Sequence, residues 1–401
     1  MTFSGSVLSG SSTLPFGHIF AEKYRIERVL GDGVSGTVYT AERLPGVAPS
    51  EASPNGFSTD GAERRVALKV IHRSLVRDRQ ISRRFHREAA ILRKLHCPYI
   101  VPLLDFGELP DGVLYMALEL VEGRALDEIM RTGPLDPSRA ITLAQQVCAA
   151  LAVAHAADVV HRDLKPGNVL IEATPDGEER ARVCDFGMAK VLRGDPSDSL
   201  NMLTEQNMVF GTPEYMAPEQ ARGDEVDARC DVYAMGVMLY EMLTGTPPFR
   251  YDTPIGVMTA HLVEEPRPPS SYVPGVITPA LEAVVLHALA KKLADRYPSA
   301  AALSEALESA RRRPSDVASA RPQPARPSGT DLGTRDTEHA LHVSQSLRRR
   351  ELGQGADAAR PRARSVRGGA DGNRRFWIAA ALIAALLGIA VGVAASLVGP
   401  R

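Results

Sequence analysis

Hydrophobic and polar positions follow two different periods along the chain. Residues 25–30, 37–41 and 65–71 are short runs rich in apolar and β-branched side chains, with polar or glycine-rich stretches between them. This is the pattern of strands joined by turns. In residues 80–95 the apolar side chains recur at helical spacing, which predicts one helix. We therefore expect the first part of the chain to be small and mainly β.

Helical patterns dominate after residue 121. Apolar residues recur at helical spacing in residues 138–157, 231–244 and 279–292, and each of these segments is predicted to be a helix. A small β-rich part followed by a larger α-rich part predicts an α+β protein of two lobes. The lobes are expected at residues 21–121 and 122–310.

Three segments have a composition typical of loops or linkers. Residues 1–20 are rich in Ser and Gly, without the basic start and apolar core of a secretory signal, and are expected to be disordered. Residues 44–64 are predicted to form a long loop of undetermined role. Residues 311–375, rich in Arg, Pro and Ala, cannot bury enough apolar surface to fold and are predicted to be a linker. Whether its arginines lie against anionic lipid or stay solvated is left open.

Residues 376–398 form an apolar run without a charged residue. At about 1.5 Å per residue a helix of this length spans roughly 34 Å, enough to cross a hydrocarbon core of ~30 Å. A buried core helix is the alternative, but a core helix this long is rarely apolar on every face. Arg374 and Arg375 favour a cytoplasmic flank before the run. We therefore predict a single-pass anchor in the inner (cytoplasmic) membrane, with the two lobes in the cytoplasm.

The formal net charge of −1 conceals an uneven distribution. Residues 1–310 hold 31 basic and 41 acidic residues, whereas residues 311–375 hold 15 arginines and 7 acidic residues. The near-zero sum gives no indication of a nucleic-acid partner. A hydrophobic share of 44% excludes wholesale disorder, and the four cysteines contain no CxxC pair that would suggest a zinc ribbon or a redox site.

One glycine-rich run lies between the first two predicted strands: Leu30-Gly31-Asp32-Gly33-Val34-Ser35-Gly36-Thr37-Val38. Glycines at this spacing let backbone N–H groups approach phosphates closely. A dinucleotide-binding loop would need a helix directly after the last glycine. Because residues 37–41 are predicted to be a strand, the run is better explained as a flap over a nucleotide.

A lysine and a glutamate stand out in apolar surroundings. Lys69 lies in an otherwise apolar predicted strand, and Glu88 lies on the apolar face of the next predicted helix. A buried ammonium group needs an anionic partner, and an inward carboxylate needs a cation. From these residues alone, a Lys69–Glu88 pair and two ordinary surface residues both remain open.

Three further runs carry chemistry. In the loop His161-Arg162-Asp163-Leu164-Lys165-Pro166-Gly167-Asn168, Asp163 can accept a hydroxyl proton, Lys165 can neutralise a transferring phosphoryl group, and Asn168 offers an oxygen to Mg²⁺. After a predicted strand at 181–184, Asp185 supplies a second metal ligand. The other two runs are Asp185-Phe186-Gly187 and Gly211-Thr212-Pro213-Glu214-Tyr215-Met216-Ala217-Pro218-Glu219.

In this order and at these spacings, the runs resemble the protein kinase family, and within it the eukaryotic-like (Hanks-type) bacterial serine/threonine kinases. The resemblance covers about residues 20–309. It implies the two-lobed protein kinase fold, ATP as the phosphate donor, and Mg²⁺ as the metal, with Mn²⁺ as an alternative.

The resemblance also implies roles for single residues. Asp163 would be the catalytic base, Lys165 the contact to the γ-phosphate, Lys69 the lysine that holds the α- and β-phosphates, and Glu88 its ion-pair partner. Asn168 and Asp185 would be the metal ligands, and Leu118 the gatekeeper. The nucleotide-binding residues would be Leu30, Gly31, Asp32, Gly33, Val34, Ser35, Gly36, Thr37, Val38, Ala67, Lys69, Glu119 and Val121.

Four further residues are assigned roles by the same resemblance. Glu219 and Arg296 are similar to a buried ion pair of the family, and Asp231 is similar to the helix residue that braces the catalytic loop. Arg162 resembles the arginine that binds a phosphorylated activation-loop residue. The alternative is that Arg162 packs against the backbone.

Substrate class and phosphosites are implied by a few positions. Lys165 and Thr212 are similar to residues of Ser/Thr-specific members of the family, and Thr212 is expected in the activation loop. The candidate phosphosites before it are Ser197, Ser199 and Thr204, of which we favour Thr204.

The function expected from the resemblance is a membrane-anchored serine/threonine protein kinase that phosphorylates itself and other proteins. Dimerisation would support autophosphorylation in trans. A catalytically inactive, membrane-tethered pseudokinase scaffold is the alternative, but all four residues whose loss would define it are present: Lys69, Asp163, Asn168 and Asp185. A kinase of small alcohols would lack the 211–219 segment.

Overall fold

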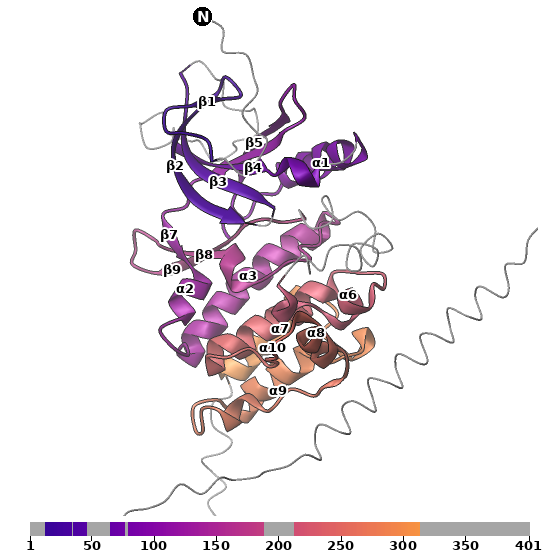
Figure 1. The fold of residues 1–401 in the computed structure, drawn as a ribbon. Helices are drawn as coiled ribbons and strands as arrows, with labels where there is room; N and C mark the ends of the chain where they lie inside the picture. Colours follow the sequence, from indigo (N-terminus) through magenta and orange to yellow (C-terminus); the bar gives the residue numbers. More distant parts are fainter. Residues whose placement is uncertain (1–12, 34, 46–64, 77–78, 188–211, 313–401) are drawn as a thin grey trace, which may run out of the picture. The chain divides into compact units, whose positions relative to one another are not determined.

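The first part of the protein is a six-stranded antiparallel sheet with one helix against it (Figure 1). In this computed structural model the described residues are 13–33, 35–45, 65–76, 79–187 and 212–312. The strand order is β1-β2-β3-β4-β6-β5. The elements are β1 (Ile19–Phe20), β2 (Tyr24–Gly33), β3 (Gly36–Arg43), β4 (Arg65–Ile71), α1 (Arg79–Leu92), β5 (Leu103–Glu108) and β6 (Leu114–Glu119).

The alternation of side chains along β4 assigns the two faces of this sheet. Val66 and Leu68 are buried in an apolar cluster on one face. Ile71 is buried on the other, together with Phe85 and Ala89 of α1. Because neighbouring side chains of a strand point to opposite faces, the alternation places Lys69 on the α1 face.

The second part is mainly helical. It contains a three-stranded sheet of β7 (Gly123–Ala125), β8 (Val169–Ala173) and β9 (Glu179–Val183). The helices are α2 (Leu126–Met130), α3 (Pro137–Ala156), α6 (Pro218–Arg222), α7 (Arg229–Thr244), α8 (Pro254–Val263), α9 (Pro279–Ala288) and α10 (Ala300–Arg312). Its short 3₁₀ turns are η3 (Pro166–Asn168), η4 (Pro213–Tyr215), η5 (Pro269–Ser271) and η6 (Leu293–Asp295); a further one, η2 (Arg73–Leu75), lies in the first part between β4 and α1.

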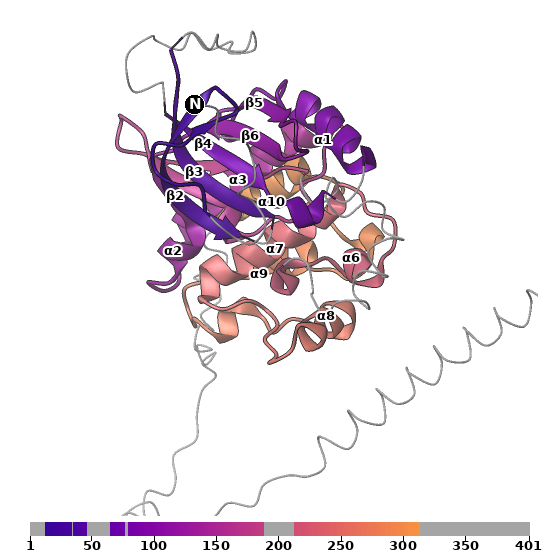
Figure 2. The ribbon, with the colours of Figure 1, turned by 45° about the horizontal axis from the view of Figure 1, so that its top comes forward.

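Helix α7 is the centre of this second part. Its residues are buried along almost the whole helix, and α3, α9 and α10 pack around it (Figure 2). The N-terminus of α3 is capped by Asp136, whose carboxylate accepts hydrogen bonds from the N–H groups of Ser138 and Arg139. A carboxylate at this position also interacts favourably with the helix dipole.

The two parts meet through the backbone beside β9. The N–H of Val101 donates to the oxygen of Val183 over 2.9 Å, and the N–H of Val183 donates to the oxygen of Tyr99 over 2.8 Å. The residue pair Ile100–Val183 forms a parallel bridge. These bonds attach the chain that leads into β5 to the strand that ends just before Asp185.

The predicted strands and helices are present, with three differences in their limits. Helix α1 ends at Leu92 rather than at residue 95. Strand β1 precedes residue 21, and Phe20 is buried in the sheet core, so the folded part begins earlier than expected. Helix α9 ends at Ala288 rather than near residue 292. The guanidinium group of Arg296 donates to the main-chain oxygens of Ala290 and Lys291, which holds the chain just after the helix.

Several predictions fall on parts of the chain outside the described residues. These are Val34, most of the loop at 44–64, the phosphosite candidate Thr204, nearly all of the linker at 311–375 and the apolar run at 376–398. In the described ranges no helix is both long and apolar enough to cross a bilayer.

Candidate active site

A buried carboxylate on α7 organises the loop between α3 and β8. Asp231 accepts hydrogen bonds from the N–H groups of His161 and Arg162, over 2.8 and 2.9 Å, and from Nε2 of His155 over 2.7 Å. Burial disfavours the charged form of Asp231, but the hydrogen bond from His155 and nearby charges outweigh it and lower the pKa. Arg162 has a φ of +66°, which is unfavourable for a residue with a side chain. The bonds to Asp231 hold the loop in this conformation, which is the bracing role expected of Asp231.

The loop brings three of the predicted catalytic residues together. Nζ of Lys165 lies 2.9 Å from Oδ2 of Asp163. Nδ2 of Asn168 donates to the main-chain oxygen of Asp163 over 2.8 Å. A carboxylate that can accept a proton, an ammonium group and an amide oxygen therefore lie within one short segment.

Pairing of β8 with β9 brings Asp185, the second predicted metal ligand, to the same place. Val169, which follows Asn168, is opposite Val183, and the N–H of Cys184 donates to the oxygen of Asn168 over 3.0 Å. Asp185 is the next residue. Amide and carboxylate oxygens suit a hard divalent cation such as Mg²⁺. Within the described ranges no group of three or more His, Cys, Asp or Glu residues could hold a metal.

Lys69 is buried, and its partner differs from the expected one. Its Nζ lies 2.7 Å from Oδ2 of Asp185, and the Lys69 side chain is 4% exposed. Burial disfavours the charged form of Asp185, but the Lys69 ammonium outweighs it and lowers the carboxyl pKa. Glu88 lies on the buried face of α1, as predicted. Among ion pairs between described residues, however, none joins Glu88 to Lys69; the ammonium group is bound by Asp185 instead.

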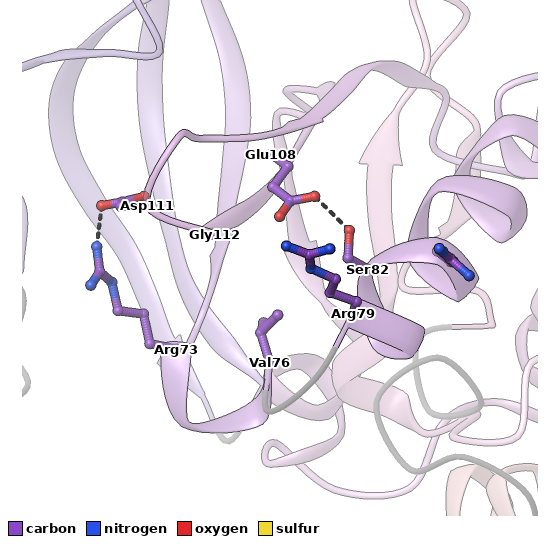
Figure 3. Close-up of a pocket in the computed structure, with 8 residues that line it drawn as sticks. Arg73, Val76, Arg79, Ser82, Glu108, Asp111 and Gly112 are labelled. Carbon is purple, nitrogen blue, oxygen red and sulfur yellow. Dashed lines mark hydrogen bonds and ion pairs between the residues drawn. The ribbon is translucent and has the colours of Figure 1, made fainter.

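A cavity of about 540 Å³ lies beside the first turns of α1, the helix that carries Glu88 (Figure 3). On α1, the hydroxyl of Ser82 donates to Oε2 of Glu108 of β5 over 2.5 Å. Arg73 of η2, which also lines the cavity, pairs with Asp111. Apolar packing of α1 is concentrated further along, at Phe85 and beyond. A small shift of α1 therefore breaks few apolar contacts at its start, and such a shift would change the distance from Glu88 to Lys69.

The glycine-rich run forms the turn between β2 and β3. Gly36 has a φ of +155°, and a Cβ at this position would lie 2.2 Å from the carbonyl oxygen of Val70. Gly36 is therefore required by the close approach of β3 and β4. The turn is further held by the hydroxyl of Thr37, which donates to Asp32 over 2.6 Å. Leu30, before the turn, is 40% exposed, as a residue that covers a ligand would be.

The residues expected around adenine lie on neighbouring strands. Ala67 of β4 is opposite Leu118 of β6, and Glu119 ends that strand, two residues before Val121. The sequence analysis missed Arg182, which is nearly buried and whose Nη2 lies 2.8 Å from Oε2 of Glu119. Arg182 also bonds Glu172 over 3.0 Å. No local signal identifies it, because its partners are 63 and 10 residues away.

The segment after the activation region lies beside the catalytic loop. Thr212 borders the same small cavity as Arg162 and Asp163. Nε2 of Gln220 donates to the main-chain oxygen of Arg162 over 2.8 Å. In the described part of the chain, Nε of Arg162 is buried without a hydrogen-bond partner. This leaves both interpretations of Arg162 open, because the residues that would be phosphorylated lie outside the described ranges.

Other side chains near the site have clear geometry. Arg296 and Glu219, predicted to be a buried ion pair, form a fully buried pair with distances of 2.7 and 2.8 Å. Burial raises the pKa of the Cys184 thiol to about 12, which disfavours the reactive thiolate form. His161 packs on Phe186 with ring centroids 4.7 Å apart.

The family model for the protein kinase domain matches residues 56–305. The chain belongs to the protein kinase family. The matched range contains every catalytic and metal-binding candidate, whereas the glycine-rich run at 30–38 precedes it. A protein kinase uses ATP with a divalent metal, and the two-lobed fold described above is that of the family.

Curated relatives and solved structures agree with this assignment. The chain is 41% identical over 302 residues to the serine/threonine-protein kinase pkn3 of Myxococcus xanthus, covering 74% of this chain and 52% of the relative. It is 41% identical to PknB of Mycobacterium tuberculosis, covering 70% and 42%. The kinase domain of M. tuberculosis PknI superposes with a TM-score of 0.56 at 26% identity, covering 75% of this chain and 99% of that one. The chain thus spans about half or less of the length of these curated relatives.

Proposed function

We propose that the protein is a serine/threonine protein kinase that transfers the γ-phosphoryl group of ATP to Ser and Thr hydroxyls of proteins. The observation that supports this most directly is the loop in which Lys165 and Asn168 bond Asp163, beside the Lys69–Asp185 pair. Both curated relatives described above carry the name serine/threonine-protein kinase.

Each residue has a defined task in this proposal. Asp163 accepts the proton of the attacking hydroxyl and orients its oxygen, and Lys165 balances charge on the transferring group. Lys69 holds the α- and β-phosphates. Asn168 and Asp185 would hold Mg²⁺, which neutralises phosphate charge when bound. Catalysis would come mainly from positioning and charge neutralisation, because phosphoryl transfer demands little covalent chemistry from the protein.

The two competing functions are less well supported. In a pseudokinase scaffold the positions of Lys69, Asp163, Asn168 and Asp185 would be free to vary. All four residues are present, in two bonded groups that the pairing of β8 with β9 brings together. In a kinase of small molecules the segment from Thr212 to Glu219 would have no peptide to bind. Here Gln220, the residue after this segment, donates a hydrogen bond to the main-chain oxygen of Arg162 in the catalytic loop.

Phosphate transfer to protein tests the proposal directly. We expect the full chain to transfer label from [γ-³²P]ATP with Mg²⁺ to dephosphorylated casein and to itself, and not to choline or an aminoglycoside. The label should be found on Ser and Thr after acid hydrolysis. Label on a small alcohol alone would contradict a protein kinase, and ATP binding without any transfer would favour the pseudokinase.

We further propose that residues 376–398 anchor the protein in the cytoplasmic membrane, with the kinase domain on the cytoplasmic side. The support is the length and uncharged composition of this run and the two arginines before it. When cells expressing the chain are fractionated, we expect the full chain in the membrane fraction after a carbonate wash and a variant ending at residue 375 in the soluble fraction. A full chain released by the wash would contradict the anchor.

A further inference from the structure

A series of buried hydrogen bonds runs from the chain after α9 to the segment that contains Thr212. His261, on α8, is fully buried. Its Nε2 lies 2.9 Å from the main-chain oxygen of Glu214, and its Nδ1 lies 2.8 Å from the hydroxyl of Tyr233 on α7. That hydroxyl lies 3.4 Å from Nζ of Lys291. Residues from four parts of the sequence thus meet around one imidazole ring.

The chemistry of the partners determines the direction of each hydrogen bond. A carbonyl oxygen can only accept, so Nε2 of His261 carries a proton and donates to Glu214. Burial, and then the charge of Lys291, lower the pKa of His261 to about 3, so the ring is neutral near pH 7. Its Nδ1 therefore accepts from the hydroxyl of Tyr233, which in turn accepts from Lys291.

Aromatic packing holds the same ring from the sides. Phe249 lies edge-on to His261 with centroids 4.9 Å apart, and Nζ of Lys291 lies 4.4 Å from the centre of the Phe249 ring. Tyr233 is also edge-on to His261 at 5.6 Å. The imidazole has little freedom to turn, so the position of its Nε2 is determined by the helical part of the molecule.

The main-chain oxygen of Glu214, which accepts the hydrogen bond from His261, lies in a short turn that depends on contacts with other elements. Turn η4 is a single 3₁₀ turn of three residues, and such turns have weak internal hydrogen bonding. The side chain of Tyr215 bonds Glu241 of α7 over 2.5 Å. The bond from His261 acts on the main chain itself, at Glu214, two residues after Thr212.

We propose that His261 is a positioning residue for the protein substrate. Through its bond to Glu214 it holds η4 where Thr212 borders Asp163, and so keeps the peptide-binding segment in register with the catalytic base. This inference rests on the proposed kinase function. None of the described contacts of His261 involves Lys69, Asn168 or Asp185, so its loss should affect protein substrate and leave ATP almost unaffected.

Three variants of the full chain separate positioning from simple stability. His261→Phe keeps a ring beside Phe249 but removes both hydrogen bonds. His261→Gln keeps an N–H that can donate to Glu214. Phe249→Leu loosens the packing of the ring and leaves both hydrogen bonds of His261 in place, so it serves as the stability control.

The readouts are KM for dephosphorylated casein, KM for ATP, and the melting temperature. We expect His261→Phe to raise the casein KM by about 5- to 10-fold, the factor expected for one lost hydrogen bond. The ATP KM should stay within about twofold, and His261→Gln should restore most of the casein KM. Phe249→Leu should lower the melting temperature without a comparable change in casein KM.

Equal rises of both KM values, or a casein KM that follows the melting temperature across all three variants, would show that His261 is only structural. Hydrogen exchange at the backbone N–H groups of residues 214–216 provides a second test that does not depend on activity. Exchange there should be faster in His261→Phe than in wild type and His261→Gln; unchanged exchange would overturn the inference. Absence of casein labelling by a folded wild-type chain would instead count against the proposed function, with the exchange result still deciding the role of His261.

Discussion

Replacement of Asp163 by alanine is expected to abolish most phosphate transfer while nucleotide binding is largely retained. Removal of a general base lowers kcat by about 10²- to 10⁴-fold. Asp163 bonds Lys165 and Asn168 within its own loop, whereas Lys69 is held separately by Asp185. Phosphate transfer is measured as incorporation of labelled phosphate into casein, and nucleotide binding as ATP affinity, both on the same preparations.

Asp176→Ala is a matched control for this substitution. Asp176 is an exposed carboxylate in the turn between β8 and β9, and its removal should leave both activity and ATP affinity unchanged. Mapping of phosphosites in wild type and Asp163→Ala then shows which residues are autophosphorylated, Thr204 being the favoured one. If the Asp163→Ala variant incorporated phosphate as fast as wild type, Asp163 would not be the base.

Arg296→Met is expected to cause the largest loss of stability. Both side chains of the Arg296–Glu219 pair are fully buried, and removal of one partner leaves an uncompensated charge in the interior. Such a change costs about 3–5 kcal/mol, which for a domain of this size lowers the melting temperature by roughly 10 °C. Arg296 also bonds the main-chain oxygens of Ala290, Lys291 and Arg229, and their loss adds to the effect.

The same substitution on the surface provides the control. Arg131 pairs with Asp127 over 3.2 Å, but the arginine side chain is 74% exposed. Exposed pairs contribute about 0–1 kcal/mol, so Arg131→Met should change the melting temperature by only a few degrees at most. Urea unfolding of the two variants compares the free energies directly. Similar losses in both would show that burial of the Arg296–Glu219 pair has no special effect.

Much of the fold could be predicted from the sequence because the spacing of apolar residues within one strand or helix depends only on neighbouring residues. The apolar run at residues 65–71, predicted to be a strand, matches the limits of β4. The helical spacing in residues 80–95 placed Glu88 on the inner face of α1, where the structure has it. Such patterns depend only on the spacing of neighbouring side chains in a strand or a helix, so no knowledge of distant residues is required.

The candidate site was partly predictable for a different reason. Asp163, Lys165 and Asn168 lie in one loop of eight residues, so chain connectivity alone keeps them close. Pairing of two adjacent strands, β8 and β9, then adds Asp185. These residues could be identified from short runs, whereas Arg182 and His261 could not, because their partners lie in other elements of the fold.

The sequence by itself determined the order of the β-rich and the helical part, the buried face of α1, and the group of charged and polar residues that carries the proposed chemistry. Only the tertiary structure decided which carboxylate Lys69 binds. Glu88 and Asp185 are both possible partners of the Lys69 ammonium group. The distance that favours Asp185 depends on how α1, β4 and β9 pack together. The same holds for the bond from His261 to Glu214: its partners are 47 residues apart, and they meet only when α8 packs on η4.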